Sequence, residues 1–268
     1  MPEGDNVWRT ARSLHAALAS QVLLGSDFRV PKLATLDLAG NTVDNVVSRG
    51  KHLLMRTSGP AGELSIHSHL LMDGSWRVYA PGQRWNKPAF QARVVLETKP
   101  ATAVGFLLGI LEVVPTAEEA QSVGHLGPDL LGPDWDADEA LRRLRSDPER
   151  SIGLALLDQR NLAGVGNVYR CELCFLAGVH PLAKVSQVRD LPRIVQLAKT
   201  LLEANKDRNR RNTVGGPAGR NASPVWVYGC AGQPCLRCRT PVVHTKLGET
   251  ELTERDLYFC PRCQPETI

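Results

Sequence analysis

The pattern of apolar and polar positions begins with a helix. Near the amino terminus, apolar side chains recur three or four residues apart, which is the spacing of one helix face. Asp5 or Asn6 is suited to cap this helix, because its side-chain oxygen can accept a hydrogen bond from a backbone N–H of the first turn. The apolar positions of this face are Val7, Ala11, Leu14 and Leu18.

From Gln21 to about Leu111 the pattern changes to short runs typical of β-strands, separated by turn residues. The run from 104 to 111 is apolar throughout and predicts one buried strand. Strands joined by short turns in this way predict an antiparallel sandwich or barrel. The other strand-like runs are 28–30, 43–47, 52–56, 64–69, 76–79 and 93–97.

The second half of the chain returns to a helical period. Residues 127–134 are rich in Gly and Pro and predict an interdomain linker. After them, Asp136 and Glu139 have the spacing of a capping box, and Asp147 ahead of Pro148 predicts the start of another helix. Further helices are expected over 152–157, over 168–175 and after Asp190.

Length and composition are those of an ordinary globular protein, with 268 residues, 43% hydrophobic and 22% charged. The net charge of +4 is compatible with a polyanionic partner but too common to indicate one. Between Lys206 and Arg220 five basic residues stand against one acid, which predicts a flexible basic loop. Residues 1–20 carry charges where a signal peptide needs an apolar core, and no apolar run approaches the roughly 20 residues of a membrane span. A cytoplasmic protein without a membrane partner is therefore expected.

The most specific local signal is a cysteine pattern near the carboxyl terminus. Cys235 and Cys238 form one Cys-x2-Cys pair, Cys260 and Cys263 form a second, and 21 residues separate the two pairs. This spacing predicts a four-thiolate site for one zinc ion, with iron or a redox dithiol as the alternatives. Four protein ligands leave no open coordination position, so a structural role is expected.

Two other pairs with metal-like spacing are weaker signals. Cys171 and Cys174 lie one turn apart in a predicted helix with no second pair nearby, and we expect them to be core-facing or incidental thiols. His67 and His69 lie on one face of a predicted strand and could be metal ligands. Because no third ligand is in view, packing and hydrogen bonding near a turn are favoured for both histidines.

Candidate chemistry is found at the amino terminus. Loss of Met1 would leave Pro2 with a free secondary amine beside the carboxylic acid of Glu3. A proline amine that condenses with an aldehyde carbon stays a cation and acts as an electron sink. An α-amine also has a pKa of about 8, so part of it is already nucleophilic at neutral pH. The alternative is an inert, frayed terminus, which is common in proteins.

Two short basic or glycine-rich segments are candidates for phosphate contacts. The turn from Gly164 to Asn167 joins two predicted helices, and amides at the start of the second helix would suit a backbone phosphate, although such a turn also marks close helix packing. Lys51 follows Arg49 and Gly50 at the start of a strand, where a solvated sheet edge is the alternative.

Together these segments resemble the formamidopyrimidine-DNA glycosylase and endonuclease VIII family over essentially the whole chain. The resemblance implies an α+β multidomain protein. An amino-terminal helix and antiparallel β-sandwich would occupy 1–126, a linker 127–136, a helical domain with a helix-two-turn-helix motif 137–231, and a zinc finger 232–268. The matching segments are Pro2-Glu3, Arg49-Gly50-Lys51, Leu157-Asp158-Gln159, Ala163 to Tyr169 and Arg255 to Gln264.

The resemblance also implies an activity, that of a bifunctional DNA glycosylase and abasic-site lyase of base-excision repair. Such an enzyme flips a damaged nucleotide out of double-stranded DNA, or meets it in single-stranded DNA. Pro2 would attack C1′, Glu3 would move protons, and β,δ-elimination would cut the strand. Lys51, Asn167 and Arg255 would hold phosphates, and Lys51 and Arg255 are counted with the catalytic residues. A monomer without a small-molecule cofactor is expected, bound to the nucleoid when it is on DNA.

The start Met-Pro-Glu-Gly-Asp resembles the endonuclease VIII branch, which implies oxidised pyrimidines as the main substrates. A purine-directed enzyme of the same family is the alternative. Leu71 or Met72 would fill the gap that a flipped base leaves, in a stretch that departs from the family's usual Gln-Leu-Tyr. From another class, a zinc-ribbon DNA-binding protein without catalysis remains possible, but it would have no use for Pro2 and Glu3.

Overall fold

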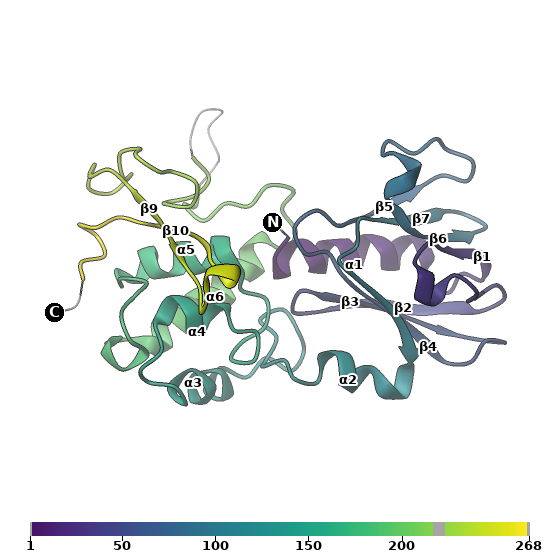
Figure 1. Cartoon of the computed structure of the whole chain (residues 1–268), viewed down its shortest axis with the longest axis horizontal. Coiled ribbons are helices and arrows are strands. Elements are labelled where there is room, and N and C mark those ends of the chain that lie inside the picture. The colour runs from purple at the N-terminus through teal and green to yellow at the C-terminus, as the bar shows by residue number, and fades with distance from the viewer. Residues whose placement is uncertain (1, 217–222, 267–268) are drawn as a thin grey trace. The chain divides into compact units, whose positions relative to one another are not determined.

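The chain folds as two units, Met1–His125 and Leu126–Ile268, in a computed structural model that describes residues 2–216 and 223–266 (Figure 1). The basic loop expected between Lys206 and Arg220 lies partly outside the described residues. Within the described ranges, no helix combines the length and the apolar character needed to cross a membrane.

The first unit is a helix packed with two antiparallel sheets. Helix α1 (Gly4–Leu18) contributes its predicted apolar face to a core that both sheets share (Figure 1). One sheet has the order β1-β6-β7-β5 and the other β2-β3-β4-β8. The strands are β1 Leu23–Phe28, β2 Thr42–Arg49, β3 His52–Ser58, β4 Leu64–His69, β5 Ser75–Tyr79, β6 Ala92–Thr98, β7 Thr102–Phe106 and β8 Ile110–Pro115, and a short helix, α2 (Glu119–Val123), follows them.

The start of α1 differs from the prediction. Neither Asp5 nor Asn6 caps the helix, because the helix begins earlier, at Gly4, with Glu3 as its N-cap residue. The backbone carbonyl of Glu3 accepts hydrogen bonds from the N–H groups of Asn6 and Val7, at 2.9 and 3.0 Å. Asp5 instead lies inside the first turn, where its negative charge interacts favourably with the helix dipole.

The apolar run 104–111 is not one strand, so this prediction was wrong. Its first half ends β7 and its second half begins β8, and these strands belong to different sheets. Between them Leu107 adopts a left-handed backbone conformation (φ 47°), which turns the chain from one sheet to the other. The residues of the turn itself, 107–109, are leucines and a glycine, so the sequence carries no polar residue to mark the turn.

The strand predicted over 28–30 was placed too far along the chain, since β1 begins at Leu23 and ends at Phe28. Half of this strand's residues are small or polar, and its pairing with β6 is irregular between Leu23 and Gly25. The sequence of β1 therefore lacks the regular alternation of apolar and polar residues that marks a strand.

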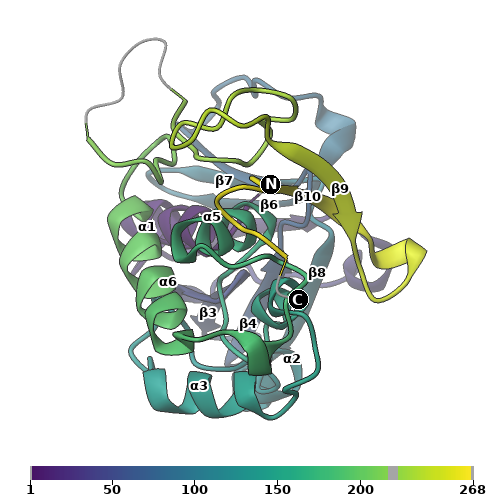
Figure 2. The ribbon, with the colours of Figure 1, turned by 90° about the vertical axis from the view of Figure 1, so that its left-hand side faces the viewer.

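The second unit packs helices against a zinc-finger-like segment. Helix α5 lies beside α6, and the hairpin of β9 and β10 lies against α5 (Figure 2). Apolar residues of all four helices form one core, and α5 also contributes to a second core with the cysteine-rich segment. The elements are α3 Ala137–Arg145, α4 Ile152–Leu157, α5 Asn167–Ala177, α6 Leu191–Asn205, β9 Val243–Leu247 and β10 Arg255–Phe259.

The predicted caps of this unit are partly correct. Asp136 and Asp190 accept hydrogen bonds from backbone N–H groups of their helices, both at 3.0 Å. Glu139, however, does not complete a capping box, because its carboxylate binds Arg142 and Arg143.

No helix begins at Asp147-Pro148, so that prediction was wrong. The carbonyls of Pro148 and Arg150 accept hydrogen bonds from Ser186 and Val185, both at 2.9 Å, which commits this segment to a loop. The next helix, α4, starts at Ile152 and is capped by Ser151.

Candidate functional site

Pro2 lines a cavity of about 310 Å³ in the first unit. Three structural elements form its wall: the first turns of α1, the turn after β4 and the start of β5. The cavity therefore brings the chain's second residue together with side chains about 70 positions away. The other residues that line it are Asn6, Arg9, Thr10, Leu70, Gly74, Ser75, Trp76 and Arg77.

Glu3 is fully buried and directly follows Pro2. Its extended backbone and the two hydrogen bonds to its carbonyl fix it as the N-cap residue of α1. Because α1 is anchored in the core of the first unit, the terminus that carries Pro2 and Glu3 is held in place. Residues 2 and 3 therefore do not form a frayed terminus.

The turn between β4 and β5 presents two apolar side chains to solvent. Leu71 and Met72 are 49% and 54% exposed, although both are large and apolar. Leu71 has a left-handed backbone (φ 49°), and its side chain passes so close to Gly109 that a Cβ there would lie 2.1 Å from Leu71 Cδ1. Both ends of the turn, Leu70 and Gly74, line the Pro2 cavity.

His69 supports this turn, because the N–H of Leu71 donates to His69 Nδ1 at 3.0 Å. Burial, with Lys51 and His67 nearby, lowers the pKa of His69 to about 4. The ring is therefore neutral at pH 7 and keeps a lone pair on Nδ1. This hydrogen bond near a turn is the role that the sequence favoured for His69.

Lys51 lies in the two-residue turn that joins β2 to β3. Gly50 before it has a positive φ of 58°, which glycine adopts without strain. Four histidines cluster beside this hairpin, and ring contacts link His52 to the other three. These four are His52, His67, His69 and His125.

A chain of hydrogen bonds runs through this cluster. His52 Nδ1 lies 2.8 Å from His67 Nε2, and His67 Nδ1 lies 3.2 Å from a carboxylate oxygen of Glu112. Burial and the neighbouring imidazoles lower the pKa of His52 to about 3. The buried His67 thus has hydrogen-bond partners at both ring nitrogens, as expected for a packed histidine.

In the second unit, Asn167 is the first residue of α5 and is almost fully buried. Its Nδ2 donates to the carbonyl of Asp256 in β10 at 2.7 Å. The buried Arg170 donates through one nitrogen to both Asn167 Oδ1 and the same carbonyl. These bonds fix the orientation of the amide and tie α5 to the strand residue next to Arg255.

Arg255 is the first residue of β10 and is exposed. Its guanidinium makes no hydrogen bond or ion pair within residues 2–216 and 223–266. Pairing of β10 with β9 places Arg255 opposite Leu247. The second unit therefore holds Asn167 and Arg255 on connected elements, and the first unit holds Pro2, Glu3, Lys51, Leu71 and Met72.

The four cysteines predicted as ligands do converge. The sulfur atoms of Cys235, Cys238, Cys260 and Cys263 all lie within 4.8 Å of one another, with pairs at 3.4 and 4.0 Å. Thiolates bound tetrahedrally to zinc at about 2.3 Å lie about 3.8 Å apart. The sulfur positions therefore fit a tetrahedral ion with no protein ligand missing.

Cys171 and Cys174 do not join this cluster. Both are buried in α5, and burial raises their pKa to about 11 and about 12. They are packed, protonated thiols, as the sequence indicated.

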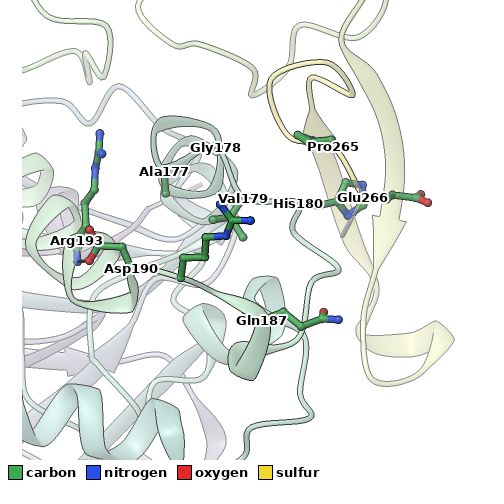
Figure 3. A pocket seen from close by; sticks show the side chains of 10 residues that line it. Ala177, Gly178, Val179, His180, Gln187, Asp190, Arg193, Pro265 and Glu266 are labelled. Carbon is green, nitrogen blue, oxygen red and sulfur yellow. Dashed lines mark hydrogen bonds between the residues drawn. The ribbon is translucent and has the colours of Figure 1, made fainter. Parts of the chain in front are cut away.

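Another cavity, of about 610 Å³, lies in the second unit (Figure 3). Asp190 and Arg193 at the start of α6 lie on one side of it, and His180 and Glu266 on the other. None of the residues that line it is a predicted site residue. The candidate chemistry of this chain is therefore centred on the Pro2 cavity.

Two residues of the Pro2 cavity were missed by the sequence analysis. Arg9 belongs to α1 and Arg77 to β5, and both residues line the cavity. The sequence held one signal for Arg77, which is a charge directly after Trp76 in a predicted strand that otherwise has apolar residues over 76–79. Exposed arginines in strands are common, so this signal could not identify a site by itself.

Models of known protein families match most of the chain. The formamidopyrimidine-DNA glycosylase N-terminal domain matches residues 1–107, and the H2TH domain of the same glycosylases matches residues 126–209. The crystal structure of Lactococcus lactis Fpg with abasic-site DNA has a TM-score of 0.81 at 21% identity, covering 99% of this chain and 100% of that one. That likeness shows the fold, including the expected sandwich, helical domain and four-cysteine segment.

Individual relatives cover almost the whole length. The probable endonuclease 8 2 of Streptomyces coelicolor is 56% identical, over 98% of this chain and 94% of the relative. The DNA-(apurinic or apyrimidinic site) lyase Nei2 of Mycolicibacterium smegmatis is 48% identical, over 98% and 99%. The chain therefore belongs to the formamidopyrimidine-DNA glycosylase family of DNA-repair enzymes, and within it to the endonuclease 8 group.

Proposed function

We propose that this chain is a DNA glycosylase and abasic-site lyase that removes oxidised pyrimidines from DNA with Pro2 as its nucleophile. The observation that carries the proposal is the position of Pro2 in a cavity, followed directly by the buried carboxyl group of Glu3. The relatives named endonuclease 8 and abasic-site lyase support the reaction class.

The reaction starts when the neutral amine of Pro2 attacks C1′ of a nucleotide that has been flipped out of the duplex. The base leaves, and the sugar ring opens as Glu3 supplies a proton. The resulting iminium acidifies the proton on C2′. β-Elimination and then δ-elimination cut the strand on both sides of the lesion.

Lys51, Asn167 and Arg255 hold the phosphates next to the damaged nucleotide. Lys51 acts as a point charge at a hairpin tip, and Arg255 offers an exposed planar fork of donors. Asn167 donates one amide hydrogen to the Asp256 carbonyl, and Arg170 donates to its oxygen. The orientation of the amide is therefore fixed, and so is the direction of its second N–H. Asn167 gives register and orientation without charge.

Replacing Lys51 or Arg255 by Gln is expected to flatten the salt dependence of DNA binding. When one phosphate contact is lost, DNA binding releases one counterion fewer. The steepness of the plot of log K against log salt concentration should therefore fall by about 0.9. Binding to an abasic-site duplex is measured by fluorescence anisotropy at several salt concentrations. Lys99→Gln, at the turn between β6 and β7, is the matched control and should leave the slope unchanged. An unaltered slope in Lys51→Gln and Arg255→Gln would argue against phosphate contacts.

The exposed pair Leu71 and Met72 fills the space that the flipped base vacates. Apolar side chains often enter a base stack in this way, because they replace part of the lost stacking. Support comes from their exposure and from two contacts of Leu71, a hydrogen bond to His69 and close packing against Gly109, which hold it in a left-handed conformation.

The ion held by the four cysteines is zinc. Four thiolates at these distances suit zinc, and a closed site has no open position for substrate. Its role is to stabilise the fold around the hairpin that carries Arg255.

A panel of damaged duplexes tests the substrate class. We expect single-turnover cleavage of duplexes with dihydrouracil or thymine glycol to be at least about tenfold faster than cleavage of 8-oxoguanine opposite cytosine. A preference for 8-oxoguanine would instead indicate the purine-directed branch. Absence of any borohydride-trapped adduct with abasic DNA, in protein shown by mass spectrometry to start at Pro2, would indicate a binding protein without catalysis.

A further inference from the structure

The Pro2 cavity contains more positive charge than the attack on C1′ requires. Both charged side chains that line it, among the described residues, are arginines, Arg9 and Arg77. The remaining lining side chains are neutral. A cavity of this kind is suited to a group that becomes negative during the reaction.

Arg77 is the better placed of the two arginines to bind a ligand. It is exposed on β5, and its guanidinium makes no hydrogen bond or ion pair with any residue that the structure describes. Arg77 is flanked by Trp76, which is buried and donates to Ser68 at 3.1 Å. The strand is therefore anchored on one face while its charged residue is available on the other.

The position of the base follows from the position of Pro2. For attack, the amine must come within about 3–3.5 Å of C1′, and the base is bonded to that same carbon. A pyrimidine bound in this way lies in or at the mouth of the cavity, whose volume equals about ten water molecules. Its carbonyl oxygens are the nearest acceptors for a guanidinium on the cavity wall.

We propose that Arg77 is a catalytic residue for base removal, which donates hydrogen bonds to a carbonyl oxygen of the damaged pyrimidine and stabilises the base as it leaves. The inference rests on the proposed function and adds a role for the leaving group. A bond forms between the Pro2 nitrogen and C1′, and the bond from C1′ to N1 breaks. The electron pair leaves with the base and spreads onto its carbonyl oxygen. The proton lost by the amine ends on the released base, so the step balances.

Abasic DNA separates this role from that of Pro2. An abasic site has no base to lose, so Arg77 should matter for base removal and not for the lyase step. A charge-assisted hydrogen bond is worth about 1.5–3 kcal/mol, which corresponds to roughly 10- to 100-fold in rate. Arg77→Gln should therefore slow excision of dihydrouracil by about that factor in single-turnover assays, while borohydride trapping on abasic duplex stays within about twofold.

The chemical role also predicts a dependence on the leaving group. Dihydrouracil has a saturated ring and spreads negative charge less well than 5-hydroxyuracil, so its excision should suffer more in Arg77→Gln. Arg77→Lys, which keeps the charge but not the planar fork, should retain part of the rate. Lys99→Gln is the matched control, since it removes an exposed charge beyond the other end of the same sheet, where Tyr79 pairs with Thr102.

Each outcome decides the inference. A selective loss of base excision that is larger for dihydrouracil supports it. An equal loss on abasic and damaged duplexes, with a flatter salt slope, would show that Arg77 binds a phosphate and would overturn it, as would unchanged excision. Failure of the proposed function is seen separately, because wild-type protein would then form no adduct with abasic DNA.

Discussion

Protein that retains any residue ahead of Pro2 is expected to lose base excision, covalent trapping and strand cleavage together. Acylation turns the secondary amine into an amide, whose nitrogen lone pair is delocalised into the carbonyl and no longer attacks C1′. Rates should fall to the background measured without enzyme. Borohydride trapping and single-turnover cleavage on abasic duplex measure the effect, and intact mass identifies the terminus.

The matched control for this prediction is the same protein preparation, assayed before and after its amino-terminal extension is removed. A cleavable extension is placed so that the protease leaves Pro2 as the first residue, and activity is measured before and after cleavage. DNA affinity should be similar in both states, because Lys51, Asn167 and Arg255 are unaltered. Full activity with the extension in place would exclude Pro2 as the nucleophile and would direct attention to a lysine.

Removal of the metal is expected to weaken DNA binding by about tenfold or more, because the segment that carries Arg255 loses its structure. The cysteine-rich segment shares a small core with α5, in which Phe175 stacks on Trp226. A segment of this size depends on its ion for folding. Chelation or Cys260→Ser should therefore release one zinc per chain and change the fluorescence of Trp226.

Two comparisons show whether the metal is structural. Cys230→Ser changes a cysteine outside the four-sulfur cluster and should keep both zinc and DNA affinity. Adduct formation on a single-stranded abasic oligonucleotide should survive chelation in part, since the ion is not at the reacting carbon. If the rate followed the identity of a substituted ion such as cobalt or cadmium, the metal would take part in the chemistry.

Elements with a strong period were predictable, but only some of their ends were, such as those of α4 and β4. The apolar face of α1 follows from helical spacing and is buried as expected. The start of α1 was missed because Glu3, a residue that usually faces solvent, is buried there. The run 104–111 was misassigned because its turn, residues 107–109, contains no polar residue that would mark it.

Candidate site residues stood out in the sequence where they are neighbours in the chain or have the spacing of metal ligands. Pro2 and Glu3 are adjacent, and the four cysteines have a diagnostic spacing. Arg77 lines the Pro2 cavity because β5 packs against α1, and Asn167 meets Asp256 across 89 residues. Such approaches depend on tertiary packing, which a local pattern does not encode.

The hydrogen bond between Asn167 and β10 affects which positions tolerate substitution. Asn167 and Arg170 both bind the backbone carbonyl of Asp256, so the helix contacts the strand through an atom that every amino acid possesses. The Asp256 side chain is half exposed, and its one ion pair among the residues that the structure describes is with the exposed His244. Substitutions at position 256 should therefore be nearly neutral, whereas substitutions at positions 167 and 170 on the helix should break these hydrogen bonds.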